Sequence, residues 1–159
     1  MKSASHTAST STPLGGLGEQ RLHQILGYQL AQAAIVTYGV FEEMVGAPLK
    51  LRPVEYTVMM LVKENAGVSP AQLSKALAVT RPNISVWIDK LEARGLVRRE
   101  KNATDRRGQL LRITEKGAAL AAKATRLLIE GERKAFSTVT AVEQMMMTEL
   151  LHKLARARA

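Results

Sequence analysis

The sequence contains no cysteine, which excludes disulfide bonds, thiolate metal sites and a cysteine-based oxidation switch. Its three histidines, His6, His23 and His152, are far apart and lack the spacing of metal ligands. No run of apolar residues approaches the roughly 18 that a membrane span needs, and the N-terminus lacks the apolar stretch of a secretory signal. We also find no nucleophile–base pair, phosphate loop or metal motif. We therefore expect no enzyme, no catalytic residue, no metal, no cofactor and no membrane partner.

The charge of the chain is strongly unbalanced toward positive. Among 159 residues, 23 are Lys or Arg and 14 are Asp or Glu, which gives a formal net charge of +9. Hydrophobic residues make up 46% of the chain, enough for one domain with a core. The excess favours a polyanionic partner, with nucleic acid first and an anionic membrane surface second. The alternative is a basic protein with a solvated surface.

The first part of the chain is predicted to be a tail and a long helix. Residues 1–18 are small, polar and glycine-rich, so we expect them to be disordered. From residue 19 to residue 45, apolar side chains recur at spacings of three and four. This pattern predicts one amphipathic helix of about 26 residues, or about 39 Å. Because that exceeds the need of a compact domain, we expect part of it to pack on another subunit.

Capping signals mark the following helices. Pro53 suits the first position of a second helix. The segment "SPAQ" predicts a third helix with Ser69 as its N-cap and Gln72 three residues on. Thr80 is the predicted N-cap of a fourth helix, and Gly95 suits the position just after its end.

The fourth helix is predicted to have two different sides. At about 100° per residue, one side is apolar and faces the core. It carries Ile84, Trp87, Ile88 and Leu91. The opposite side is exposed. It carries Pro82, Asn83, Ser85, Val86, Asp89 and Lys90.

Two short alternating stretches follow, "LVRREK" and "QLLRIT", joined by "NATDRRG". They predict a β-hairpin of two strands. Thr114 is expected to cap a fifth helix, and Thr140 with Glu143 forms the capping box of a sixth. The predicted fold is mainly α with a small β-hairpin. Two helices with a short turn, followed by a hairpin, make a winged helix-turn-helix.

In this architecture the second helix enters the major groove of DNA, and a cationic hairpin tip reaches the minor groove. The segment from Arg81 to Arg112 carries nine cationic and four anionic side chains, a net charge of +5. Such a surface supplies salt-dependent affinity for DNA. Asp89 lies among the candidate contacts, where it either orients a basic side chain or repels wrong sequences. Arg98 and Arg99 are either DNA contacts or solvated strand residues.

The stretch "VSPAQLSKALAVTRPNISVWIDKLEARGLVRREKNATDRRGQLLRITEKG" resembles the DNA-binding core of the MarR family of bacterial regulators. The shared features are the "LEARGLV" helix end, the D-x-R wing and the "RITEKG" entry to the next helix. The resemblance implies a cytoplasmic homodimer on a pseudo-palindromic double-stranded operator. It also implies domains at 19–50 (N-terminal dimerisation helix), 51–115 (winged helix-turn-helix) and 116–159 (C-terminal dimerisation helices).

The resemblance also assigns roles to residues of this sequence. Asp105 would pair with the wing arginines, Arg107 would enter the minor groove, and Arg106 would contact phosphate. Family members often carry arginine where this chain has Val86, which could instead contact a thymine methyl. Asn83 or Ser85 could hydrogen-bond a base. The full predicted DNA-binding set is Ser69, Thr80, Arg81, Pro82, Asn83, Ser85, Val86, Lys90, Arg98, Asp105, Arg106 and Arg107.

Similar proteins sense a small molecule, often an aromatic acid, so we expect a repressor released by such an acid or its coenzyme A thioester. The predicted ligand residues are His23, Tyr28, Tyr38, Phe41, Arg52, Tyr56, Met59 and Met60. Ordinary core packing is the alternative for this set. The predicted dimer contacts are Leu22, Leu26, Leu150, Leu151 and Leu154. Two other functions remain open, namely an architectural DNA-binding protein without a ligand and a winged domain used for protein contacts.

Overall fold

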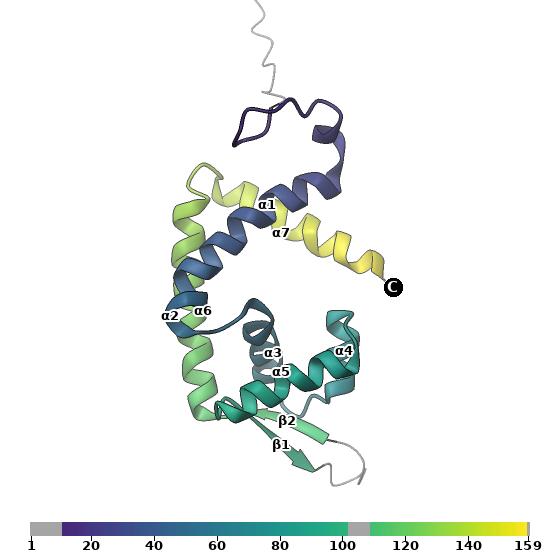
Figure 1. Cartoon of the computed structure of the whole chain (residues 1–159), viewed down its shortest axis with the longest axis vertical. Helices are drawn as coiled ribbons and strands as arrows, with labels where there is room; N and C mark the ends of the chain where they lie inside the picture. The colour runs from purple at the N-terminus through teal and green to yellow at the C-terminus, as the bar shows by residue number, and fades with distance from the viewer. Residues whose placement is uncertain (1–10, 102–108, 159) are drawn as a thin grey trace, which may run out of the picture. The chain divides into compact units, whose positions relative to one another are not determined.

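The computed structural model describes residues 11–101 and 109–158, which form two compact units, one up to Gly39 and the other from Val40 (Figure 1). Helices dominate both, and the strands β1 (Val97–Lys101) and β2 (Gln109–Ile113) form an antiparallel hairpin. The mainly α fold with a β-hairpin is therefore confirmed. Within the described residues no helix is long and apolar enough to cross a membrane.

The N-terminal unit corrects the prediction of one unbroken helix from residue 19. A 3₁₀ turn, η1 (Leu22–Gln24), precedes α1 (Leu26–Phe41), and Ile25 between them is extended. The hydroxyl of Tyr28 donates a 2.6 Å hydrogen bond to Glu19. In a continuous helix these two residues would be about 13 Å apart along the axis, so this contact requires the break. The structure describes residues 11–18 of the predicted tail as a turn closed by the Ser11–Gly18 pairing.

The helix also continues further than predicted at its other end. A π-helical turn, η2 (Glu42–Gly46), leads into α2 (Ala47–Leu49). Lys50 then adopts a left-handed conformation with φ of 49°, which ends the helical path.

The winged part of the C-terminal unit follows the predicted order. It comprises α3 (Pro53–Glu64), α4 (Pro70–Leu77), α5 (Arg81–Ala93) and the hairpin. Ser69 and Gln72 form both hydrogen bonds of the predicted capping box, and Gly95 has φ of 67°. Thr80 holds the N-cap position of α5, but its side chain makes no capping hydrogen bond.

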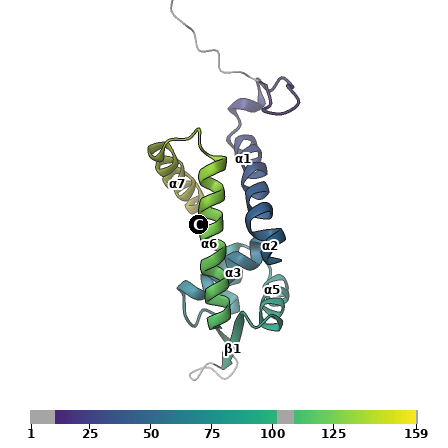
Figure 2. The same cartoon turned by 90° about the vertical axis from the view of Figure 1, so that its left-hand side faces the viewer.

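Two further helices complete the unit, α6 (Glu115–Ala135) and α7 (Ala141–Ala155), with a terminal turn η3 (Arg156–Arg158). The predicted caps at Thr114 and at Thr140 with Glu143 are both present. Helix α6 packs beside α3, as Figure 2 shows.

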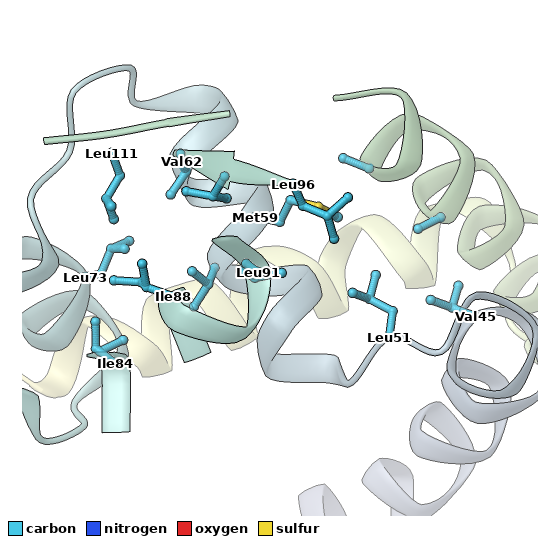
Figure 3. Close-up of a cluster of buried hydrophobic side chains, with 14 of the residues drawn as sticks. Val45, Leu51, Met59, Val62, Leu73, Ile84, Ile88, Leu91, Leu96 and Leu111 are labelled. Carbon is cyan, nitrogen blue, oxygen red and sulfur yellow. The ribbon is translucent and has the colours of Figure 1, made fainter. Parts of the chain in front are cut away.

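One apolar core joins the helices α3 to α6 and the hairpin (Figure 3). Its largest fully buried side chains come from α3, α4, α5 and the hairpin, with additions from η2 and the segment before α3. They are Val45, Leu51, Val58, Met59, Val62, Leu73, Ile84, Ile88, Leu91, Leu96, Val97 and Leu111.

The hairpin is tied to the helices on two sides. Val68, just before α4, forms an isolated antiparallel β-bridge with Leu111, a contact that the sequence pattern did not predict. On the other side, the Thr114 hydroxyl donates to the Gly95 carbonyl at 2.7 Å. A Cβ at position 117 would collide with the Leu96 carbonyl, so Gly117 allows the first turn of α6 to approach β1.

Candidate nucleic-acid interface

The turn between α4 and α5 sets the geometry of the two helices. Ala78 takes the left-handed conformation, with φ of 52°. The Ser74 hydroxyl donates to the Val79 carbonyl at 2.5 Å, and the Val79 N–H donates back to the Ser74 carbonyl at 3.1 Å. Leu73 of α4 and Ile84 of α5 are both buried in the core. The helix pair therefore has the rigid turn that a helix-turn-helix needs.

Helix α5 has the two sides that its sequence predicts. Ile84, Ile88 and Leu91 are fully buried, and Trp87 is half-buried against the same core. The opposite side is exposed throughout. It carries Arg81, Pro82, Asn83, Ser85, Val86, Asp89 and Lys90. Val86 is a large apolar side chain that keeps 49% of its surface exposed amid polar neighbours.

Arg99 of β1 links the hairpin to α5. Its guanidinium pairs with Asp89 and with Glu92, and its backbone N–H donates to Glu92 at 3.2 Å. Burial lowers the pKa of Arg99, but the hydrogen bonds and charges of the two carboxylates outweigh it and raise the pKa above its ordinary value. Of the two roles left open for Asp89, the structure therefore supports the orientation of a basic neighbour.

Several other cations of this region are also paired. Arg98 lies 2.8 Å from Glu100, and Arg112 lies 3.1 Å from the same carboxylate. Within residues 11–101 and 109–158, the cations from Arg81 onward in this segment that form no ion pair are Arg81, Lys90 and Lys101. The net charge of the segment therefore overstates how many cations are free to meet phosphate.

Two surface hollows flank the exposed side of α5. The smaller, of about 610 Å³, lies at the turn and is lined by Lys75 and Arg81 among others. The larger, a groove of about 880 Å³, is lined by Lys90, Arg94, Lys50 and Arg52, with Glu42 and Glu55 opposing them. Each hollow thus brings cations of α5 beside cations of another segment.

Arg94 fixes the C-terminal end of α5. It donates to the carbonyls of Lys50 at 2.7 Å and Leu49 at 3.1 Å, and its Nη1 lies 3.8 Å from the buried carboxylate of Glu55. These contacts connect the end of α5 to the end of α2, to the residue after it and to α3. The sequence did not predict Arg94 as a site residue. Arg99 was predicted either to contact DNA or to be solvated, and the structure pairs it with Asp89 and Glu92 instead. Both residues have partners set by tertiary packing, which no local pattern reveals.

The remaining predicted DNA contacts fall in three places. Ser69 uses its hydroxyl in the cap of α4, where it accepts from the Gln72 N–H at 3.2 Å. Thr80 and Arg98 are exposed. Asp105, Arg106 and Arg107 lie outside the described residues.

The structure brings together only part of the predicted ligand set. The rings of Phe41 and Tyr56 lie 6.1 Å apart, and the Tyr56 hydroxyl is 2.9 Å from that of Thr125. Thr125 also contacts the sulfur of Met60 at 3.8 Å. Thr125 was missed because one threonine on a long helix carries no sequence signal.

The other ligand candidates are more scattered. Met59 is fully buried in the core, and Arg52 is exposed at the groove. His23 and Tyr28 meet at Glu19 within the N-terminal unit, where the hydrogen bond to Glu19 raises the pKa of Tyr28. Tyr38 is exposed in the same unit.

The predicted dimer contacts are all exposed in the single chain. Leu22 and Leu26 belong to the N-terminal unit, and Leu150, Leu151 and Leu154 belong to α7. In the part of the chain that the structure describes, no three acidic, histidine or cysteine side chains gather as a metal site.

Comparison with known proteins agrees with this geometry. A family model described as the MarR family matches residues 49–108. A putative transcriptional regulatory protein for the hcr operon of Thauera aromatica is 25% identical over 131 residues, which cover 82% of this chain and 79% of that protein. The structure of the transcriptional repressor CouR bound to a 23-mer DNA duplex is 29% identical, with a TM-score of 0.76, and the match covers 90% of this chain and 99% of CouR. A mutant of MarR from Escherichia coli complexed with operator DNA is 25% identical, with a TM-score of 0.72, over 81% of this chain and 92% of that one.

Proposed function

We propose that this chain is a DNA-binding transcriptional regulator of the MarR family, a homodimeric repressor that a small aromatic acid, or its coenzyme A thioester, releases from its operator. The observation that carries the proposal is the exposed polar side of α5, held between a rigid turn and a hairpin that Arg99 ties to it. This is the surface that a winged helix-turn-helix presents to the major groove. The repressor role is supported by the likeness to CouR.

A homodimer is supported by the surface of α7. None of its residues is buried, although it carries Leu150, Leu151 and Leu154 and a run of three methionines. A helix with so many exposed apolar side chains favours a partner that covers them. Two copies related by a two-fold axis would read two half-sites, so we propose a pseudo-palindromic operator.

An aromatic effector is supported by the side chains around Tyr56. The Phe41 ring, the Met60 thioether and the hydroxyls of Tyr56 and Thr125 together suit an aromatic ring that carries a polar group. Arg52, at the start of the same helix as Tyr56, could pair with a carboxylate. Such a ligand would release DNA only by binding more tightly to a dimer whose recognition helices are wrongly spaced for the operator.

The test is fluorescence anisotropy on labelled DNA from upstream of the gene itself, with random-sequence competitor. We expect specific binding that one member of a panel of aromatic acids and their thioesters weakens. Specific binding that no compound changes would overturn the proposed effector and keep the regulator. If random DNA competes as well as the labelled fragment, although selection from a random library also yields no motif, the chain is an architectural DNA-binding protein instead.

A further inference from the structure

The exposed side of α5 limits which bases it can read. In a winged helix-turn-helix the N-terminal half of the recognition helix meets the base edges. At about 100° per residue, Pro82, Val86 and Asp89 form the middle of the exposed stripe, and Asn83 and Ser85 flank it. Within the described residues, the side chains of Asn83 and Ser85 form no hydrogen bond to the rest of the chain. Their donors and acceptors are therefore free for bases.

Asp89, by contrast, is not available to contact a base. A free carboxylate on the stripe would accept a hydrogen bond from the cytosine amino group. Here Arg99 pairs with the Asp89 carboxylate and holds Glu92 at the same time. The Arg99 side chain keeps only 24% of its surface exposed, and its guanidinium is already paired with carboxylates of α5. It is therefore not free to contact guanine.

The two free cations of α5 lie at the ends of the stripe. Arg81 shares the hollow at the turn with Lys75 of α4. Lys90 shares the larger groove with Arg52 and Arg94. Cations gathered from neighbouring segments suit the phosphate backbone, which positions a protein without reading sequence. This leaves one amide, one hydroxyl and an apolar surface for the bases.

We propose that α5 reads A·T base pairs at the centre of each half-site, with Val86 against a thymine methyl and Asn83 hydrogen-bonded to adenine. Adenine offers N6 and N7 to an amide side chain in the major groove, and thymine alone offers a methyl group there. Pro82, one turn before Val86, extends the apolar surface. Arg99 is a positioning residue that keeps Asp89 from adding a preference for cytosine. This inference rests on the proposed function, because it requires a sequence-specific DNA-binding protein.

The first experiment is selection of binding sites from a random duplex library with the full chain. An enriched inverted repeat with A·T pairs at the centre of each half-site is the expected result. An enriched repeat with only G·C pairs there would overturn the inference and leave the regulator intact. No enrichment of any sequence would overturn the proposed function itself, so the two failures are distinguishable.

Thymine methyl contacts are tested by replacing single thymines with uracil in the selected site. Loss of a buried methyl should weaken binding of the wild-type protein about fourfold at one thymine in each half-site. The Val86→Ala variant, whose changed side chain is exposed and should leave the melting temperature unaltered, should be insensitive at that thymine. If Val86→Ala keeps the same sensitivity to uracil, the assignment of Val86 is wrong.

Asn83 is tested in the same way, by combining its substitution with single base changes in the selected site. Asn83→Ala should lose about 5- to 150-fold in affinity for the selected site and should no longer prefer adenine at one position. A uniform loss across all sequences, with the preference for adenine retained, would mean that Asn83 contacts the backbone only.

The role of Arg99 is tested by a double variant. Arg99→Gln should weaken operator binding about five- to tenfold, because it leaves two unpaired carboxylates beside DNA. Arg99→Gln combined with Asp89→Asn should recover part of that loss, which a merely destabilising change would not do. Asp89→Asn alone should retain the A·T preference. If Asp89→Asn instead removes a preference for a C·G pair, Asp89 reads cytosine and the inference fails.

Discussion

Helices α5 and α7 both face solvent over much of their surface, but what they expose differs. Helix α5 buries Ile84, Ile88 and Leu91 and exposes polar side chains around Val86. Helix α7 buries no residue and exposes leucines and methionines. Helix α5 buries its apolar side within its own chain, and its exposed side suits a polar partner. Helix α7 exposes apolar side chains that a partner could cover, so under the proposed homodimer the two helices would contact different partners, DNA for α5 and a second copy of the chain for α7.

The most direct test of this comparison is to replace one leucine by alanine in each of the two helices. Leu91→Ala, at a fully buried site, should lower the free energy of unfolding by about 2–5 kcal/mol at every protein concentration. Leu150→Ala, at a site with 62% of its surface exposed in the single chain, should act through association, so its effect should depend on concentration. Urea unfolding at several protein concentrations measures both. If the effect of Leu150→Ala is the same at all concentrations, α7 packs on its own chain and the comparison fails.

The next effect concerns the contact between α6 and the hairpin. Gly117→Ala should destabilise the winged part by about 1–3 kcal/mol, because the added Cβ would overlap the Leu96 carbonyl oxygen and would also lie 3.0 Å from the Ile113 side chain. Gly39→Ala is the matched control. Its Cβ would meet nothing within 4 Å, so it should be stabilising by about 0.5–1 kcal/mol. Thermal unfolding distinguishes the two, and equal shifts would mean that the α6 start has room to move.

A similar or smaller effect is expected at the end of α5. Arg94→Gln should cost roughly 1–3 kcal/mol, because it leaves the Glu55 carboxylate without its cation and at least one carbonyl without a donor. Arg94→Lys keeps the charge but cannot serve both carbonyls, so it should lie between wild type and Arg94→Gln. Operator affinity measured beside stability would show whether this anchor also positions α5. Identical stability for all three proteins would contradict the anchoring role.

The smallest effect is expected at the start of α7. Hydrogen bonds from the backbone N–H and hydroxyl of Thr140 lower the pKa of Glu143 below its ordinary value of 4.5. The ionised form is therefore favoured in the folded helix. Its contribution is complete above the ordinary pKa and is lost as the pH falls through the lowered one. The protection of the first-turn amides of α7, measured as their exchange rate relative to that of an unstructured chain at the same pH, should fall in acid for wild type. Glu143→Gln should remove that dependence, and wild-type protection that stays unchanged below pH 4.5 would count against the capping box.

The sequence predicted those parts of the fold that depend on neighbouring residues. Ser69, Thr114 and Thr140 predict helix starts, because an N-cap side chain bonds to a backbone N–H only three residues further on. The hairpin and the two sides of α5 follow from local periodicity in the same way.

The features that sequence reasoning missed depend on residues far apart in the chain. The break before α1 comes from the Tyr28–Glu19 contact across nine residues, and the pairing of Val68 with Leu111 spans more than forty. The Arg99 pairs likewise join a strand to a helix. Composition predicted an excess of cations in this segment, but it could not reveal that Arg98, Arg99 and Arg112 form ion pairs with carboxylates of the same chain.

The link from Arg99 to Asp89 and Glu92 has a consequence for how binding preference can evolve. Within the described residues, the side chains of Asn83 and Val86 have no hydrogen-bonding or ionic partner in the chain, so these positions can be exchanged singly while the fold is retained. Positions 89, 92 and 99 share one set of ion pairs, and a change at Arg99 leaves both carboxylates unpaired, so the three positions should covary among related chains. A duplicated gene could thus acquire a new operator through the two independent positions, while the trio passes unchanged from ancestor to descendant.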